Sequence, residues 1–436
     1  MKLLLRSWLG RSPILFVAWC IVAAFGAYFC MYAFRKPFTA GTYADISLWG
    51  VHYKTILIVS QVLGYMCSKW MGIKVISELK PSSRQVLIIG LIVFAEIALV
   101  LFGIVPAPYN FLLLFLNGLP LGMVWGVIFS YLEGRKFTEA LGMGLSISLI
   151  VSSGFLKTIY FQVGSLLPDL SEFWLPAIIG ILFLPAFLLF SWMLNMIPEP
   201  DLTDKNLRSE RLPMTSADKK LVLKNYRWGI MAFVLIYMLL STMRDFRDNF
   251  SVEIWDEIQP GWNANVFSKT ETIIGFVVLV SVACISIFRS NAKGFAAVQG
   301  LIALGLMICG ASTFAFSRQL IGPFTWMLTL GAGMFLAYTP IQVALYERMI
   351  ALFKIKGNAG FFVYISDAFG YLGSVVLLFY KEFFFKDLQW SQVLIHFSYL
   401  LAALGLCALC FAWFYFSEKS KNYSVAIGDG KREVVV

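Results

Sequence analysis

Apolar residues occur along this chain in long runs that short polar segments separate. The runs are about 20 residues long, the length that an α-helix needs to cross the hydrocarbon core of a bilayer. Their spacing predicts twelve membrane-spanning helices. The predicted helices cover residues 13–44, 52–71, 86–105, 109–132, 141–163, 174–196, 228–250, 268–288, 295–316, 322–346, 359–380 and 392–416.

The longest polar segment divides these predicted helices into six and six. Its last part, from Ser216, predicts a short surface helix with Ser216 as its N-cap. The sequence therefore predicts an all-α membrane protein with two pseudo-symmetric six-helix bundles. The predicted parts are an N-terminal bundle at 1–196, a cytoplasmic central loop at 197–227, a C-terminal bundle at 228–416 and a cytoplasmic tail at 417–436.

Composition excludes a soluble globular protein. Hydrophobic residues make up 59% of the chain and charged residues only 14%, with a mean hydropathy of +0.77. The net charge of +10 does not indicate nucleic acid as a partner, because the cations lie in short loops between apolar runs and not in a basic patch or tail.

The loop cations predict the orientation. Of the 35 Lys and Arg residues, the even-numbered loops and both termini hold 25, the odd-numbered loops and helix ends hold nine, and Lys157 lies inside a predicted helix. This asymmetry predicts that both termini face the cytoplasm and that the chain lies in the inner or plasma membrane. A cleaved signal peptide at residues 1–30 is the alternative, but the apolar run is longer than such a peptide needs and its removal would leave eleven spans.

Cysteine and histidine usage argues against an enzyme. All seven cysteines fall in predicted helices, where they resemble small apolar residues. Cys407 and Cys410 have the spacing of a redox or metal pair, but no His, Asp or Glu lies beside them. The chain's two histidines cannot form a metal-ligand cluster or a His-based triad. The sequence thus predicts no catalytic residues, no metal and no cofactor.

Cations inside apolar runs are the strongest functional signal. Intramembrane charges are costly and mark substrate or ion pathways. Adjacent cations interrupt the first predicted helix, and arginine recurs at the corresponding depth of the seventh, so each half offers arginine to a shared anion site. Lys157 adds a deep cation from the fifth. The predicted substrate-binding residues are Arg35, Lys36, Lys157, Arg244 and Arg247.

The predicted roles of Arg35 and Arg244 each have an alternative. Arg35 could extend to the outer headgroups, because about 22 apolar residues precede it. Arg244 could pair with Asp248, four positions later on one helix face. Intramembrane acids include Glu96, which would become central with Asp367 in a proton-coupled symporter. The predicted coupling or gating residues are Asp367, Asp245, Glu133 and Arg135.

Several local sequences resemble known transporters. The six-plus-six layout and the segment Gly64–Lys74 resemble the major facilitator superfamily. A closer resemblance is to the organophosphate:phosphate antiporter family, whose helix 1 carries an Arg-Lys-Pro-Phe sequence, here Arg35–Phe38. Its helix 4 motif is matched by Asn117–Trp125, where Gly118 and Gly122 also predict close helix packing. Its helix 11 run is matched by Gly357–Phe361 and Phe369–Ser374.

The resemblance implies a function. It implies secondary active transport by alternating access, with a small organic anion, a phosphorylated metabolite, exchanged for phosphate, and with Arg35 and Arg244 binding phosphate. The family's bacterial transporters have a histidine in helix 5 where this helix has Lys157. Two alternatives stay open: a proton-coupled symporter of another small solute, and a non-transporting membrane sensor on the same fold. The expected partners are a small anion and the lipid bilayer, with the protein a monomer.

Overall fold

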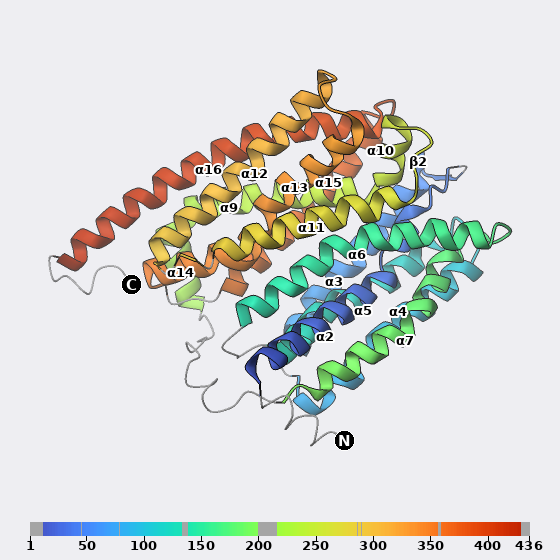
Figure 1. Cartoon of the computed structure of the whole chain (residues 1–436), viewed down its shortest axis with the longest axis horizontal. Helices are drawn as coiled ribbons and strands as arrows, with labels where there is room; N and C mark the ends of the chain where they lie inside the picture. Colours follow the sequence, from blue (N-terminus) through green and yellow to red (C-terminus); the bar gives the residue numbers. More distant parts are fainter. Residues whose placement is uncertain are drawn as a thin grey trace. The chain divides into compact units, whose positions relative to one another are not determined.

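A computed structural model of the chain describes residues 12–44, 46–77, 79–132, 138–198, 216–285, 287–288, 290–355 and 359–428. Within these ranges, regular structure is helical except for one hairpin of β1 (Ser47–Leu48) and β2 (Val51–His52) (Figure 1). The prediction of an all-α membrane fold is therefore confirmed. The long helices are α2 (Pro13–Ala33), α3 (Tyr53–Ser77), α4 (Arg84–Ile104), α5 (Phe111–Leu132), α6 (Thr138–Leu166), α7 (Leu175–Met196), α9 (Ser216–Asn249), α11 (Asn265–Ile285), α12 (Asn291–Ser317), α13 (Pro323–Pro340), α15 (Ala359–Phe384) and α16 (Trp390–Gly428).

Eleven helices of the described ranges are long and apolar enough to cross a membrane. The other long helix, α3, carries Lys54, Lys69 and Lys74, which make it more polar. One spanning segment is composite, because α13 continues through the π-helical turn η3 (Ile341–Leu345) into α14 (Tyr346–Phe353). Three short elements complete the fold: η1 (Pro37–Ala40), η2 (Pro81–Ser83) and α10 (Ser251–Ile258).

Several predicted boundaries were wrong. The last helix was predicted to end at 416, with a tail from 417, but α16 continues to Gly428. The first helix was predicted over 13–44, but α2 ends at Ala33, before the turn that leads to η1. Pro37 has no amide hydrogen to donate to the carbonyl four residues earlier, so a regular helix does not continue through it. The short surface helix predicted from Ser216 does begin there, but it runs on without interruption as the 34-residue α9.

The chain divides into two compact units. Unit 1 comprises Met1–Ser209, Asn249–Gly275 and Glu382–Phe384, and unit 2 comprises Glu210–Asp248, Phe276–Lys381 and Phe385–Val436. The domain boundaries predicted at 196 and 228 stay a prediction.

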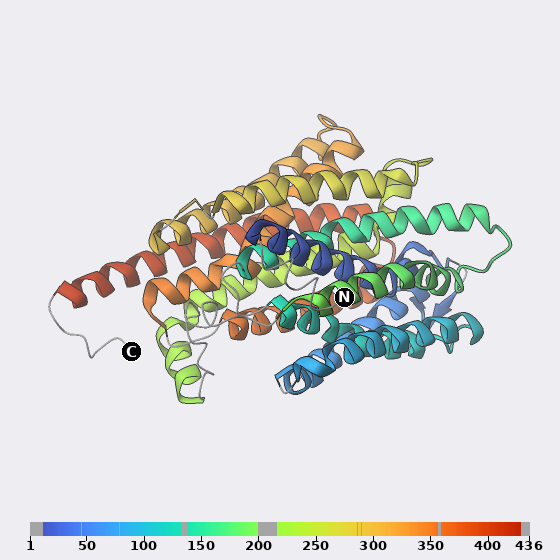
Figure 2. The ribbon, with the colours of Figure 1, turned by 60° about the horizontal axis from the view of Figure 1, so that its bottom comes forward.

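Glycine allows the closest helix contact in unit 1, between α3 and α5. A Cβ on Gly64 would lie 2.1 Å from the carbonyl oxygen of Phe115, and one on Gly118 would lie 2.3 Å from that of Gln61. Gly122 packs against Ser68 in the same way. The prediction that Gly118 and Gly122 permit close packing is confirmed. Elsewhere in this unit α2 packs on α6 and α7, and α4 packs on α5 and α7 (Figure 2).

Unit 2 also uses small residues where helices meet. Its α12 packs against both α13 and α16. A Cβ on Gly370 of α15 would come within 2.9 Å of the Ser241 side chain, and one on Gly373 within 2.4 Å of Thr242 Oγ1. These glycines bring α15 close to α9, where Asp367 of α15 accepts a hydrogen bond from Tyr237 of α9.

Candidate functional site

The break after α2 determines where the first pair of cations lies. Arg35 and Lys36 occupy the turn between α2 and η1, and their amides both donate to the carbonyl of Tyr32. Lys36 is only 7% exposed, and all four residues of η1 are buried. The two cations therefore sit within unit 1, where the chain has left the regular helix.

The side-chain amides of Asn117 and Gln61 donate to backbone carbonyls where α2 ends. Asn117 Nδ2 donates to Phe34 O and to Ala95 O, at 3.0 Å each. Gln61 Nε2 donates to Arg35 O at 3.0 Å and to Asn117 Oδ1 at 2.8 Å. Carbonyls at a helix C-terminus have no partner inside the helix. Asn117 and Gln61 thus fix the turn that carries Arg35 to α3, α4 and α5.

The guanidinium of Arg35 lies over two tyrosine rings. Its Cζ is 4.2 Å from the ring centroid of Tyr65 and 5.6 Å from that of Tyr32. Both rings are buried, at 4% and 2% exposure. Stacking on aromatic faces holds an arginine at a defined place while its nitrogens remain able to donate. This geometry favours a position inside the bundle over the headgroup alternative.

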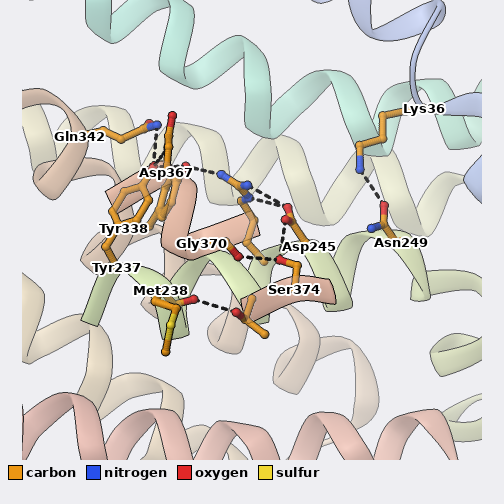
Figure 3. A network of polar contacts seen from close by, with 12 residues as sticks. Lys36, Tyr237, Met238, Asp245, Asn249, Tyr338, Gln342, Asp367, Gly370 and Ser374 are labelled. Carbon is orange, nitrogen blue, oxygen red and sulfur yellow. Dashed lines mark hydrogen bonds and ion pairs between the residues drawn. The ribbon is translucent and has the colours of Figure 1, made fainter. Parts of the chain in front are cut away.

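Three buried lysines come together in unit 1, and we call Lys36, Lys54 and Lys157 the lysine cluster. Lys36 Nζ donates to Asn249 Oδ1 at 2.8 Å, as Figure 3 shows. Lys54 Nζ lies 5.6 Å from the ring centroid of Phe250 and 2.5 Å from Glu253 Oε1. Lys54 and Lys157 are close enough for their charges to act on each other. Lys36 and Lys54 thus contact the segment Asn249–Glu253, and Lys157 lies near Lys54.

Burial in the lysine cluster is nearly complete. Lys54 and Lys157 are each 2% exposed. Lys157 belongs to α6, and its neighbour Thr158 donates to the carbonyl of Ala264 at 2.8 Å. The predicted deep position of Lys157 therefore agrees with its burial. Lys36 contacts Asn249, and Lys157 lies close enough to Lys54 for their charges to interact. Arg35 adjoins Lys36 in the chain.

Unit 2 contains a hydrogen-bonded network of its own, which Figure 3 shows. Tyr237 donates its hydroxyl to Asp367 Oδ1 at 2.5 Å, and its oxygen lies 2.9 Å from that of Tyr338. Gln342 donates to Tyr237 at 3.1 Å. Arg244 donates to the Tyr338 hydroxyl, and its Cζ lies 4.6 Å from the centre of that ring. The network links α9, α13, η3 and α15.

The charge of Arg244 is balanced by the next residue in the chain. Its Nε and Nη2 donate to Asp245 Oδ1 at 3.0 and 2.8 Å. Asp245 Oδ2 accepts a hydrogen bond from Ser374 at 2.9 Å. The sequence suggested Asp248 as the alternative partner for Arg244; the structure shows this ion pair with Asp245. Two predicted coupling residues, Asp245 and Asp367, therefore share one network with a predicted substrate-binding residue.

Arg247 has different surroundings. It is 4% exposed, and its Nη2 donates to the carbonyl of Met327 on α13 at 3.1 Å. This contact joins α9 to α13, and a role of Arg247 in substrate binding stays a prediction. The remaining two predicted gating residues, Glu133 and Arg135, lie outside the described residues, as do Gly357 and Asn358 of the helix 11 motif.

Sequence reasoning missed Lys54, Glu253 and Asn249 in unit 1, and Tyr237 and Tyr338 in unit 2. Lys54 stands at the start of a helix, where a cation is typical of an exposed loop end. The tyrosines are indistinguishable by sequence from the many aromatic residues of an apolar bundle. One signal was available, because Asn249 and Glu253 follow closely after the cations of the seventh predicted helix.

Solved structures with a similar fold are transporters by their titles. The nucleoside transporter NupG superposes with a TM-score of 0.56 at 16% identity, covering 90% of this chain and 98% of that chain. A bacterial homolog of the human lysosomal transporter Spinster gives 0.60 at 13%, covering 95% and 98%. A D-xylose-proton symporter gives 0.59 at 15%, covering 92% and 98%. The fold is that of major facilitator transporters.

The chain belongs to the family described as DUF5690, a family of unknown function, whose model matches residues 37–419. This match begins two residues after Arg35 and spans almost all of both units. No curated protein matches the sequence.

Proposed function

We propose that this protein is a secondary transporter with alternating access that moves a small organic anion, and that it exchanges phosphorylated metabolites for inorganic phosphate. The single observation that carries the proposal is the burial of three lysines, Lys36, Lys54 and Lys157, in unit 1, with Arg35 next to Lys36 in the chain. Buried cations within a membrane protein are costly and are kept where they bind or conduct charge.

The chemistry of the cluster suits a phosphate monoester. Such a group presents three oxygens, and a guanidinium can bind two of them in a bidentate manner. The lysines would add point charges that attract an anion with less geometric demand. Arg35, Lys36, Lys54 and Lys157 bring positive charge to this part of unit 1, and the carboxylates of Glu253 and Glu172 act on Lys54. An anion would be attracted to these cations.

A second candidate, proton-coupled symport, is favoured by the network in unit 2. Arg244 is already paired with Asp245, so it offers an anion less charge than the sequence suggested. Asp367 accepts from Tyr237, which contacts Tyr338. The network in unit 2 thus contains the guanidinium of Arg244 and the carboxylates of Asp245 and Asp367. A proton on Asp367 would balance these charges.

Exchange should be much faster than net flux. A site that holds excess positive charge without its anion is unfavourable in a medium of low dielectric, so the empty carrier should reorient slowly. We expect labelled phosphate to leave proteoliposomes several-fold faster when phosphate or a sugar phosphate is present outside. Equal efflux with and without external substrate would contradict obligatory exchange.

The same assay separates the alternatives. A membrane sensor on this fold would bind phosphate compounds and show no counterflow. A proton symporter that couples through Asp367 would lose its response to an imposed pH gradient in Asp367→Asn. Lys224→Ala, which removes an exposed lysine of α9, is the matched control for variants of the lysine cluster.

A further inference from the structure

Glu96 is a buried acid that neither the lysine cluster nor the network in unit 2 uses. It lies near the middle of α4 and is only 8% exposed. Both of its carboxyl oxygens are buried and have no hydrogen-bond partner among the described residues. An ionised carboxylate without a partner in such a place is very unfavourable. Burial of this kind favours the neutral, protonated form of the carboxyl group over the ionised form.

The Glu96 carboxyl group lies against the backbone of α7 at Gly180, near the ring of Phe34. A Cβ on Gly180 of α7 would lie 2.0 Å from Glu96 Oε2 and 3.2 Å from Cδ1 of Phe34. The acid thus packs directly on the bare backbone of α7, beside the aromatic ring that ends α2. Gly180 provides the space, because any larger residue would meet the carboxyl group.

No cation from the packed helices offsets the charge of Glu96. The sequences of α5, α7 and α2 contain no charged side chain, and α4 carries only Arg84 besides Glu96. Arg84 is twelve positions away, about 18 Å along the helix, and lies against Tyr131 of α5. Arg35, the residue after Phe34, is the first cation that follows α2 in the chain. The other titratable side chains on these elements are Cys20, Tyr28, Cys30 and Tyr32 of α2.

One side chain connects the acid to the anion site. Asn117 donates to Ala95 O, next to Glu96, and to Phe34 O, next to Arg35. A shift of the turn that carries Arg35 would therefore move Phe34 and the backbone of α4 at Glu96 together. Such a shift would alter the apolar packing that keeps the acid neutral.

We propose that Glu96 is a proton-binding site of the transport cycle, which holds its proton in this arrangement and releases it when the turn at Arg35 and helices α4 and α7 rearrange. The site binds a proton independently of the anion's identity. Its link to anion movement rests on the proposed function. The proposal predicts that transport responds to a pH gradient through Glu96.

Labelling with dicyclohexylcarbodiimide tests the proton directly on the full wild-type chain. The acid's proton passes to one carbodiimide nitrogen, the carboxyl oxygen adds to the central carbon, and migration of the acyl group to nitrogen gives a stable N-acylurea. This apolar reagent reaches buried protonated acids. We expect mass spectrometry to find the adduct on Glu96, with less of it when phosphate drives the cycle. No adduct on Glu96 between pH 5 and 8 would overturn the proposal, and this result needs no variant.

Flux under a pH gradient tests the link to transport. Glu96→Gln mimics the neutral acid, so we expect it to fold and to lose the several-fold response of wild-type flux to an imposed gradient. Gly90→Ala, on the same helix with open space around it, should keep that response. A full response in Glu96→Gln, or a response lost only in Asp367→Asn, would overturn the proposal. If the wild type failed to exchange phosphate, the proposed function would fail, while labelling would still decide the role of Glu96.

Discussion

Arg35→Ala should lower the affinity for phosphate compounds by roughly 10- to 150-fold, the equivalent of about 1.5–3 kcal/mol for a charge-assisted hydrogen bond. The guanidinium lies over the rings of Tyr65 and Tyr32, which hold it in place before the anion binds. The substitution therefore removes a hydrogen-bond donor that is already ordered. Binding of phosphate and sugar phosphates to the purified protein, measured by calorimetry, gives the change directly.

Arg35→Lys separates geometry from charge. An ammonium keeps the positive charge but cannot donate to two phosphate oxygens in the manner of a guanidinium, so this variant should already bind more weakly than wild type. Arg318→Ala is the matched control, because Arg318 also lies over a ring, that of Phe314 at 5.5 Å, but is exposed. Wild-type affinity in Arg35→Ala would refute the assignment of Arg35 to the site.

Gly118→Ala should be the most damaging small change to the fold. The added methyl carbon would lie 2.3 Å from the carbonyl oxygen of Gln61 and 2.9 Å from the amide nitrogen of Tyr65. Both are backbone atoms, which cannot rotate away, so α3 and α5 must move apart. Overpacking of this kind costs about 1–3 kcal/mol and occasionally more. The midpoint of thermal unfolding in detergent should fall by several degrees.

The control for that variant lies on the neighbouring helix α4. Gly90→Ala adds the same methyl group where no atom lies within 4 Å. Alanine is favoured over glycine in a helix by roughly 0.8–1 kcal/mol in water, so this variant should be at least as stable as wild type. Equal unfolding midpoints for Gly118→Ala and Gly90→Ala would mean that α3 and α5 do not touch closely at Gly118.

The helices could be predicted from the sequence because the bilayer fixes the length of an apolar run. Most predicted helices agree with the structure to within a few residues; α7, for example, was expected at 174–196 and occupies Leu175–Met196. The end of α2 was predicted wrongly, because residues 38–44 remain small or weakly apolar after the chain leaves the helix. The burial of η1 comes from unit 1 around it, and hydropathy does not distinguish that burial from a continued span.

Only the cationic residues of the site could be predicted from the sequence. Arg35, Lys36 and Lys157 stood out because cations are rare in apolar runs. Their partners did not, because Asn249 and Glu253 come from a segment more than 200 positions after Lys36 in the sequence. The pairing of Arg244 with Asp245 also depends on side-chain directions, since neighbours in a helix point about 100° apart and need long side chains to meet.

The π-helical turn η3 determines which way two tyrosines face. On a regular α-helix, eight positions at about 100° each would leave Tyr338 and Tyr346 about 80° apart. A π turn takes up roughly one extra residue, which reduces this offset to about 20°. Tyr346 accordingly meets Ser366 at 2.7 Å, while Tyr338 reaches Asp367 through Tyr237. The additional residue thus turns Tyr338 and Tyr346 toward the same side of the helix. Their hydroxyl groups lead to consecutive residues of α15, Asp367 and Ser366. Tightening η3 into an α turn would rotate one of the two tyrosines away from α15.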